Sequence, residues 1–299
     1  MKDFKKVFIV IAFVPFACEV EGVKNDSNED SQEIQSPEEK KSIPEDTIEH
    51  VEKEPISDTL SRKLDQPEEE VYDNGVKITW KSRGEGRKIS ENDMVNIDYR
   101  ASLEDGAIYD GNHLVKKPYI PFYVGWNLQT EGWDFALQKL REGDDVEIFL
   151  PAELARGEKG IPGVVPPNSN NILSVKVIGI EEPTKVVDDI KIYRVEESKP
   201  KKSEKDSIGF EDQVTMHYWV SSESSPRYDN SYQRGEPFEL TMGDGNIVPG
   251  LYKALHFAKK GDKLIIHIPA KEAYGKKGLP KFVKPNEDIL YDVFIVDVF

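Results

Sequence analysis

Residues 157–168 read GEKGIPGVVPPN, a run in which glycine and proline occupy fixed places between two more regular stretches. The same arrangement returns at residues 275–286, which read GKKGLPKFVKPN. Glycine reaches positive φ without a steric penalty and proline fixes φ near about −65°, so such a run specifies one long irregular loop. The recurrence of this loop predicts that the chain contains the same domain twice.

Self-similarity extends outward from this loop. Tyr99 and Tyr218 are 119 residues apart, and Gly132 and Gly250 are 118 residues apart, so one residue of length change keeps the register. A repeat of this length is too long for a solenoid unit and fits a duplicated domain of about 115 residues. We expect the first domain at residues 71–184 and the second at residues 185–299.

Each copy shows the same order of elements. In the first copy, apolar residues at helical spacing predict one short helix, and several apolar runs bounded by turn residues predict strands. The expected elements, in order, are strands at 76–80, 94–102 and 122–124, a helix at 131–140, and strands at 146–151 and 172–180. We therefore expect the α+β class, with two tandem domains that each wrap an antiparallel sheet on one short helix.

Residues 1–17 are typical of a secretory signal peptide. Three lysines precede the apolar run VFIVIAFVPFA at residues 7–17, which is too short to span a bilayer as a helix. The run ends at Ala17-Cys18, which resembles the lipobox of bacterial lipoproteins, and Cys18 is the only cysteine of the chain. We expect acyl chains on Cys18 to anchor the protein to a membrane. An ordinary signal peptide cleaved near a cysteine is the alternative.

Residues 18–70 have the composition of a tether. Glu, Asp, Lys, Ser, Asn and Pro dominate them, and the span contains no aromatic residue. Such a segment cannot bury enough apolar surface to offset the entropy of ordering. We expect the lipidated cysteine to be followed by a disordered acidic tether that ends at residue 70.

Composition also excludes several classes of function. The net charge of −16 argues against nucleic-acid binding, which needs clustered Lys and Arg. A single cysteine excludes an intramolecular disulfide and a cysteine zinc site, and the five histidines show no metal-ligand spacing. We expect no metal and no cofactor.

The repeated motifs are similar to those of the FKBP family of peptidyl-prolyl isomerases. The first copy carries them as YRASLEDGAIYD at 99–110, LREGD at 140–144 and the loop at 157–168. The second copy carries AYGKKG at 273–278 and VKPN at 283–286. The resemblance covers the chain after the tether. It implies an isomerase that acts on proline-containing polypeptide clients and needs no cofactor.

The resemblance also implies a proline pocket in the first copy. Its residues would be Tyr99, Tyr109, Asp110, Phe122, Trp133, Val164, Val165 and Leu173. Asp110 would be the buried polar member and Trp133 the floor. Two positions depart from the family pattern: Arg156 stands where a peptide-bonding Tyr is usual, and Gln129-Thr130 stands where an apolar pair is usual.

The second copy departs differently. Its pocket residues would be Tyr218, Tyr228, Asp229, Phe238, Ile247, Val248, Leu251, Tyr274, Phe282 and Tyr291. It keeps the peptide-bonding tyrosine as Tyr274, but Leu251 replaces the tryptophan of the floor. Core packing is the alternative role for the aromatic residues of both copies.

A dry aromatic pocket accounts for isomerisation without a nucleophile, metal or proton donor. The planar amide owes its rotational barrier of about 18–20 kcal/mol to resonance. A twisted amide has lost that resonance, and an apolar site favours it relative to water. We expect a folding helper for exported proteins, anchored to a bacterial cell-envelope membrane. A non-catalytic proline-peptide binder or chaperone, and a scaffold lipoprotein of an envelope complex, are the alternatives.

Overall fold

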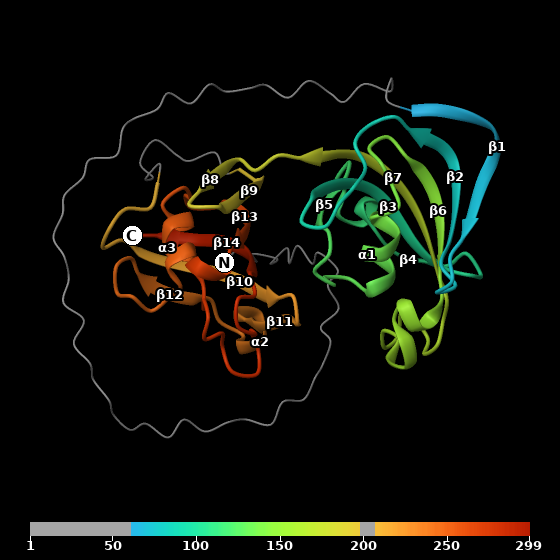
Figure 1. The fold of residues 1–299 in the computed structure, drawn as a ribbon. Coiled ribbons are helices and arrows are strands. Elements are labelled where there is room, and N and C mark those ends of the chain that lie inside the picture. The colour runs from blue at the N-terminus through green and yellow to red at the C-terminus, as the bar shows by residue number, and fades with distance from the viewer. Residues whose placement is uncertain (1–60, 198–206) are drawn as a thin grey trace, which may run out of the picture. The chain divides into compact units, whose positions relative to one another are not determined.

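The computed structural model describes residues 61–197 and 207–299. The expected signal peptide, Cys18 and the tether as far as residue 60 lie outside the described residues. The described part contains two seven-stranded antiparallel sheets (Figure 1). We call residues 61–184 the first domain and residues 185–299 the second domain, because each range contains one complete sheet.

The sheet of the first domain curves around one short helix, α1, which spans Glu131–Leu137 (Figure 1). Its strands have the order β1-β2-β6-β7-β3-β4, and β5 pairs with β3. Their bounds are β1 Ser61–Val71, β2 Lys77–Gly84, β3 Met94–Leu103, β4 Ile108–Gly111, β5 Ile120–Tyr123, β6 Asp145–Leu150 and β7 Asn171–Glu181. Alternate residues of β7 are buried, as expected of a strand with one face on the core.

The second domain repeats this topology with the order β11-β10-β14-β13-β9-β8, and β12 pairs with β10. The bounds of its strands and helices are β8 Lys185–Val187, β9 Ile190–Glu196, β10 Gln213–Ser222, β11 Ser225–Asn230, α2 Ser231–Arg234, β12 Phe238–Thr241, α3 Pro249–Leu255, β13 Lys263–Ile268 and β14 Ile289–Val298. Tyr99 pairs with Val175 in the first sheet and Tyr218 with Val293 in the second, which is the same register. The expected α+β class and the domain duplication are confirmed.

The expectation that the tether continues to residue 70 is wrong for its last ten residues. Residues 61–71 form strand β1, which pairs antiparallel with β2. Arg83 holds this edge strand through Glu68 at 2.9 Å and Glu70 at 3.1 Å. Every residue of β1 is exposed except Leu64, which is partly buried. The strand therefore has no buried face, and its sequence shows no apolar alternation.

Helix α1 ends at Leu137, three residues before the expected end. Beyond it the backbone N–H groups of Lys139 and Leu140 donate to carbonyls three residues earlier, those of Ala136 and Leu137. The last turn is therefore tightened, as is common at helix ends.

The repeated loop has the same backbone in both domains. Ile161 N–H donates to the carbonyl of Val165 at 2.7 Å, and Leu279 N–H donates to that of Val283 at 2.8 Å. Gly160 and Gly278 have φ of 56° and 65°, and a Cβ at either would lie within 2.3 Å of a carbonyl oxygen. Only glycine fits these two positions, because both the conformation and the close approach exclude a side chain.

Candidate functional site

An aromatic cluster lies in the first domain between helix α1 and the sheet. The ring of Trp133 on α1 lies 5.2 Å from that of Tyr99 on β3, edge to face, and 5.6 Å from that of Phe122 on β5, stacked. All three side chains are less than a tenth exposed. These are favourable aromatic geometries, and we call the three residues the first aromatic cluster.

The position of α1 depends on Gly132. A Cβ on this residue would lie 2.6 Å from the carbonyl oxygen of Leu154. The missing side chain lets the start of the helix approach the short 3-10 turn Ala152–Leu154. This approach sets where the neighbouring Trp133 enters the cluster.

Leu173 is fully buried beside the first aromatic cluster, and Tyr109 is partly buried against the same core. The hydroxyl of Tyr109 donates to Asn171 Oδ1 at 2.8 Å. Burial raises the pKa of this hydroxyl to about 12. The two valines of the loop separate: Val165 is 2% exposed and Val164 is 47% exposed, and neither belongs to the core around Trp133.

Asp110 is a buried carboxylate next to this cluster. It is 8% exposed and accepts the N–H of Gly111 at 2.8 Å. Burial raises its pKa, while that N–H bond, the hydrogen bond with Tyr99 and the charge of Arg156 oppose the rise. Within the part of the chain that the structure describes, no Lys or Arg forms an ion pair with it. A carboxylate held in this way can accept a hydrogen bond from a ligand.

The two departures from the family pattern meet in space. Arg156 Nη2 donates to Gln129 Oε1 at 2.7 Å, and Nη1 lies 3.4 Å from the carbonyl oxygen of Gln129. The guanidinium carries five N–H donors, so donors remain after Gln129 has been satisfied. Gln129 therefore orients Arg156 beside Tyr109. The positive guanidinium lowers the pKa of the Tyr109 hydroxyl and so partly offsets the effect of burial.

The second domain has an aromatic cluster of different composition. Leu251 on α3 is 1% exposed and lies in the same core as Tyr218 and Tyr291. The ring of Tyr218 on β10 lies 5.8 Å from both Phe238 and Tyr291. Ile247 and Val248 are partly buried against this core. The core of the second domain therefore contains an aliphatic side chain on its helix where the first domain has an indole.

Asp229 of the second domain is paired, unlike Asp110. Arg234 Nη1 lies 2.5 Å from Asp229 Oδ1, and Arg234 Nη2 donates to the hydroxyl of Tyr218 at 2.8 Å. That hydroxyl donates to Asp229 Oδ2 at 2.6 Å. Burial and the bond to Asp229 raise the pKa of Tyr218 to about 12. Arg234 ends helix α2, and Val115 holds the equivalent position of the first domain.

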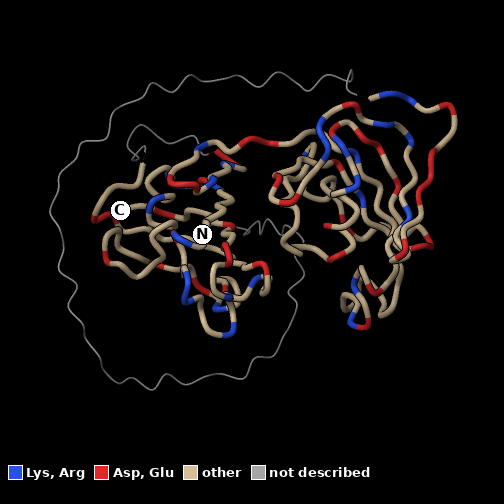
Figure 2. Tube along the Cα trace, viewed as in Figure 1, with Lys and Arg blue, Asp and Glu red and all other residues tan. Residues whose placement is uncertain are grey.

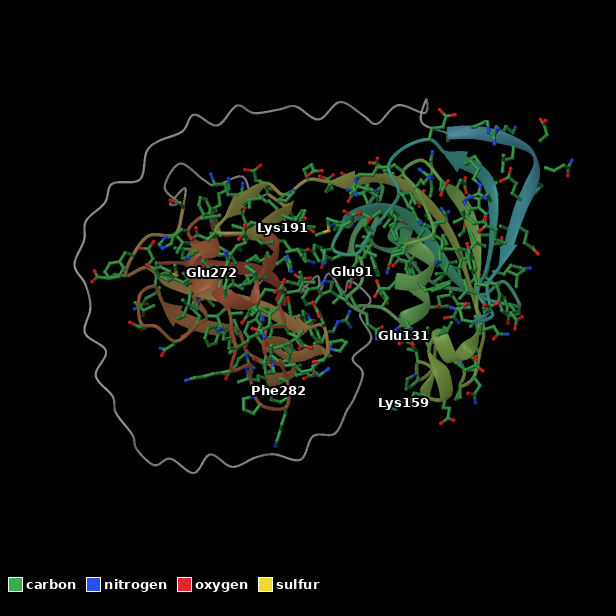
Figure 3. The ribbon with its side chains drawn as sticks, in the orientation of Figure 1. Glu91, Glu131, Lys159, Lys191, Glu272 and Phe282 are labelled. Atoms are coloured by element: carbon green, nitrogen blue, oxygen red, sulfur yellow. The ribbon has the colours of Figure 1, made fainter. Side chains whose placement is uncertain are left out.

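The loop side of the second domain carries further rings. Tyr228 stacks with Phe282 at 5.5 Å, and Phe282 is 38% exposed (Figure 3 labels it). The Tyr228 hydroxyl is buried, and burial together with the neighbouring Tyr291 and Tyr274 raises its pKa well above the ordinary value. Tyr274 and the buried Val283 also contact this core.

Two polar residues of these candidate sites were not predicted from the sequence. Asn171 fixes the hydroxyl of Tyr109, and Arg234 neutralises Asp229. The charged residue five positions after Asp229, absent from the equivalent position of the first copy, was the available signal for Arg234. Asn171 gave no comparable signal, because its pairing joins residues 62 positions apart.

The three histidines described in the second domain have structural contacts. His217 stacks on Tyr232 and approaches the Ser231 hydroxyl at 3.0 Å, and His256 approaches the carbonyl of Ile208 at 2.9 Å. His267 lies 3.1 Å from Asp288. Across residues 61–197 and 207–299 there is no group of three or more His, Cys, Asp or Glu that could hold a metal ion. The same ranges contain no helix long and apolar enough to cross a membrane.

Each half of the described chain is thus an α+β domain with a buried aromatic or aliphatic cluster between a short helix and a curved antiparallel sheet. The family model of the FKBP-type peptidyl-prolyl cis-trans isomerases matches residues 85–178 and again residues 205–296, more than half of the chain. The chain therefore belongs to the family of FKBP-type peptidyl-prolyl cis-trans isomerases and contains two copies of its domain.

The chain is also similar to individual proteins and solved structures. Human peptidyl-prolyl cis-trans isomerase FKBP10 is 28% identical over 71% of this chain, which spans 35% of the length of that relative. FK506-binding protein 1 of Debaryomyces hansenii is 36% identical over 29% of this chain and 78% of its own length. A crystal structure of the three FKBP domains of wheat FKBP73 is similar over 76% of this chain and 96% of its own, with 22% identity and a TM-score of 0.38.

Proposed function

We propose that the first domain binds a peptide segment with its proline ring against Trp133 and catalyses rotation about the bond before that proline. The observation that carries the proposal is the first aromatic cluster, in which Trp133 contacts both Tyr99 and Phe122. Rotation needs an apolar site that favours the twisted amide over the planar one. Uncatalysed isomerisation takes roughly 10–100 s, so modest stabilisation of the twisted state already gives a useful rate.

Polar groups beside the cluster would hold the peptide in place. Arg156 has N–H donors left after its bonds to Gln129. In this proposal they donate to the peptide carbonyl that a tyrosine hydroxyl would otherwise contact. Asp110 offers a buried acceptor. Both groups would fix the orientation of the amide, while the rings would supply the apolar surface.

The second domain supports a different proposal, that of a slower isomerase or a binder of proline peptides. Leu251 gives less flat surface than an indole, and Arg234 already occupies the carboxylate of Asp229. Tyr274 retains a hydroxyl for one peptide hydrogen bond, with a typical net value of about 0.5–1.5 kcal/mol. We propose that the first domain turns over proline peptides faster than the second.

We also propose that the protein assists the folding of exported proteins at a cell-envelope membrane. The support is the sequence of residues 1–18 alone, a signal-like apolar run followed by the only cysteine. The aromatic cluster and the anchor are independent, so either part of the proposal can fail without the other.

Turnover by separated domains tests the catalytic proposal. Residues 61–184 and 185–299 each contain one complete sheet, so they are the fragments to compare in a protease-coupled isomerisation assay. We expect measurable turnover by both or by the first alone, with the first faster. A faster second fragment would show that the hydrogen bond of Tyr274 outweighs the indole of Trp133. If the fragments and the full chain bind a proline peptide without turnover, the binding role replaces the catalytic one.

A further inference from the structure

The repeated loop of the second domain is basic, although the chain as a whole is acidic. Residues 271–287 read KEAYGKKGLPKFVKPNE, with five lysines and two glutamates, so their net charge is +3. The equivalent residues 153–169 read ELARGEKGIPGVVPPNS, with two cations and two glutamates, so their net charge is zero. The full chain carries −16. We call residues 271–287 the basic loop; Figure 2 shows its lysines in blue.

Most of these positive charges are not neutralised by neighbours. Lys276, Lys277 and Lys281 are exposed and form no ion pair with any residue that the structure describes. The side chain of Lys284 is 73% exposed and lies 3.9 Å from Glu287, a weak contact. Lys271 alone is closely paired, at 2.5 Å from Asp189.

These lysines alternate along the loop with residues of the proposed proline site. Tyr274 precedes Lys276 by two residues, and Phe282 lies next to Lys281. Phe282, which is labelled in Figure 3, stacks on Tyr228. Tyr228 packs against the core of the second domain. Neighbouring Cα atoms are about 3.8 Å apart, and charges interact over roughly 10 Å at 0.1 M salt. Side chains within two residues of a bound proline therefore lie in the field of the lysines.

We propose that the second domain selects proline segments flanked by acidic side chains, with Glu or Asp within two residues of the proline. This inference rests on the proposed function, since it assumes that Tyr228, Tyr274 and Phe282 contact the peptide. Lysine fits the role because its ammonium is a mobile point charge that does not require one fixed carboxylate geometry. Charged groups of this kind act through partner choice and association rate. The neutral loop of the first domain makes no such selection.

The test compares two labelled peptides that differ only in having Glu or Gln on both sides of the proline. Fluorescence anisotropy with the full chain gives the ratio of their affinities at low and high salt. A fourfold Lys→Gln variant removes the exposed charges of the basic loop, at Lys276, Lys277, Lys281 and Lys284. A matched variant removes four exposed lysines of the first domain, Lys81, Lys88, Lys116 and Lys159, so the net charge changes equally.

We expect the wild type to bind the Glu peptide about fivefold more tightly at low salt, the effect of about two exposed ion pairs of ordinary strength. The ratio should fall toward about one near 0.3 M salt, where screening is stronger. It should also fall to one in the basic-loop variant and persist in the matched variant.

Three results would overturn the inference. A ratio of one in the wild type, with both peptides bound and isomerised, removes acid selection and leaves the proposed function standing. Failure of both peptides to bind or turn over removes the proposed function as well. If vesicles containing phosphatidylserine bind in a way that needs the basic loop while the peptide ratio stays at one, the loop contacts lipid and not an acidic client.

Discussion

Replacing Trp133 by leucine, the residue at the equivalent position of the second domain, separates catalysis from folding. Trp133 is 4% exposed and makes two ring contacts, with Tyr99 and Phe122. Each such contact contributes about 0.5–1.5 kcal/mol beyond area burial. The variant should therefore lose about 1–3 kcal/mol of the free energy of unfolding from these contacts alone, and the domain should remain folded.

The Trp133→Leu variant should lose more kcat/KM than its loss of folding stability would explain. The indole supplies the flat apolar surface on which the proline ring rests in the proposed mechanism. A loss of about 1.4–2.7 kcal/mol of transition-state stabilisation lowers kcat/KM by about tenfold to a hundredfold. The protease-coupled isomerisation assay measures this, and thermal unfolding of the same sample shows that the domain is folded.

Trp80→Leu is the matched control for this variant. Trp80 lies on β2, is fully buried in the same core and makes no contact with the first aromatic cluster among the ring pairs shown by the structure. It should lower the unfolding temperature comparably and leave kcat/KM within about twofold. Equal losses of turnover in the two variants, or full turnover by Trp133→Leu, would refute the role of the indole as the catalytic surface.

Three further predictions concern charged groups and the anchor. Burial raises the pKa of Asp110 above its ordinary 3.8. Between 3.8 and the raised pKa the folded domain binds more protons than the unfolded chain, so its stability falls as the pH rises through this window. Asp110→Asn should abolish this fall, seen as a flatter dependence of unfolding temperature on pH, and should weaken peptide binding. Arg234→Gln should lower the free energy of unfolding in urea by only about 0.2–1 kcal/mol, because its pair with Asp229 is partly exposed, and unchanged turnover by the full chain would agree with a slow second domain. Cys18→Ser should move the protein from the membrane fraction to the soluble fraction on cell fractionation, and an unchanged distribution would contradict the lipid anchor.

The duplication and the fold class could be read from the sequence because short-range geometry dictates the residues involved. Gly160 and Gly278 hold positive φ with a carbonyl oxygen in the place of a side chain. Such positions accept one residue type, so these glycines recur in both copies of the loop. Alternate residues of β7 are buried because one face of the strand packs on the core. The apolar residues of its sequence alternate accordingly, so the strand could be predicted.

Strand β1 could not be read in the same way. It pairs through backbone hydrogen bonds and through Arg83, which lies 15 residues after Glu68. Backbone pairing needs no particular side chain, and an exposed edge strand needs no apolar alternation. Its composition is therefore that of the polar segment that precedes it.

The polar arrangement of the two sites was decided by the tertiary structure alone. Arg156 and Gln129 are separate departures from a pattern in the sequence, and only the fold shows that one holds the other. Asp110 and Asp229 occupy equivalent positions, yet one is buried without an ion pair and the other is neutralised by Arg234. The sequence determined the backbone that both copies share, because glycine and apolar periodicity act locally. The polar contacts of each candidate site join side chains that are distant in the sequence, and no local sequence pattern predicts such contacts.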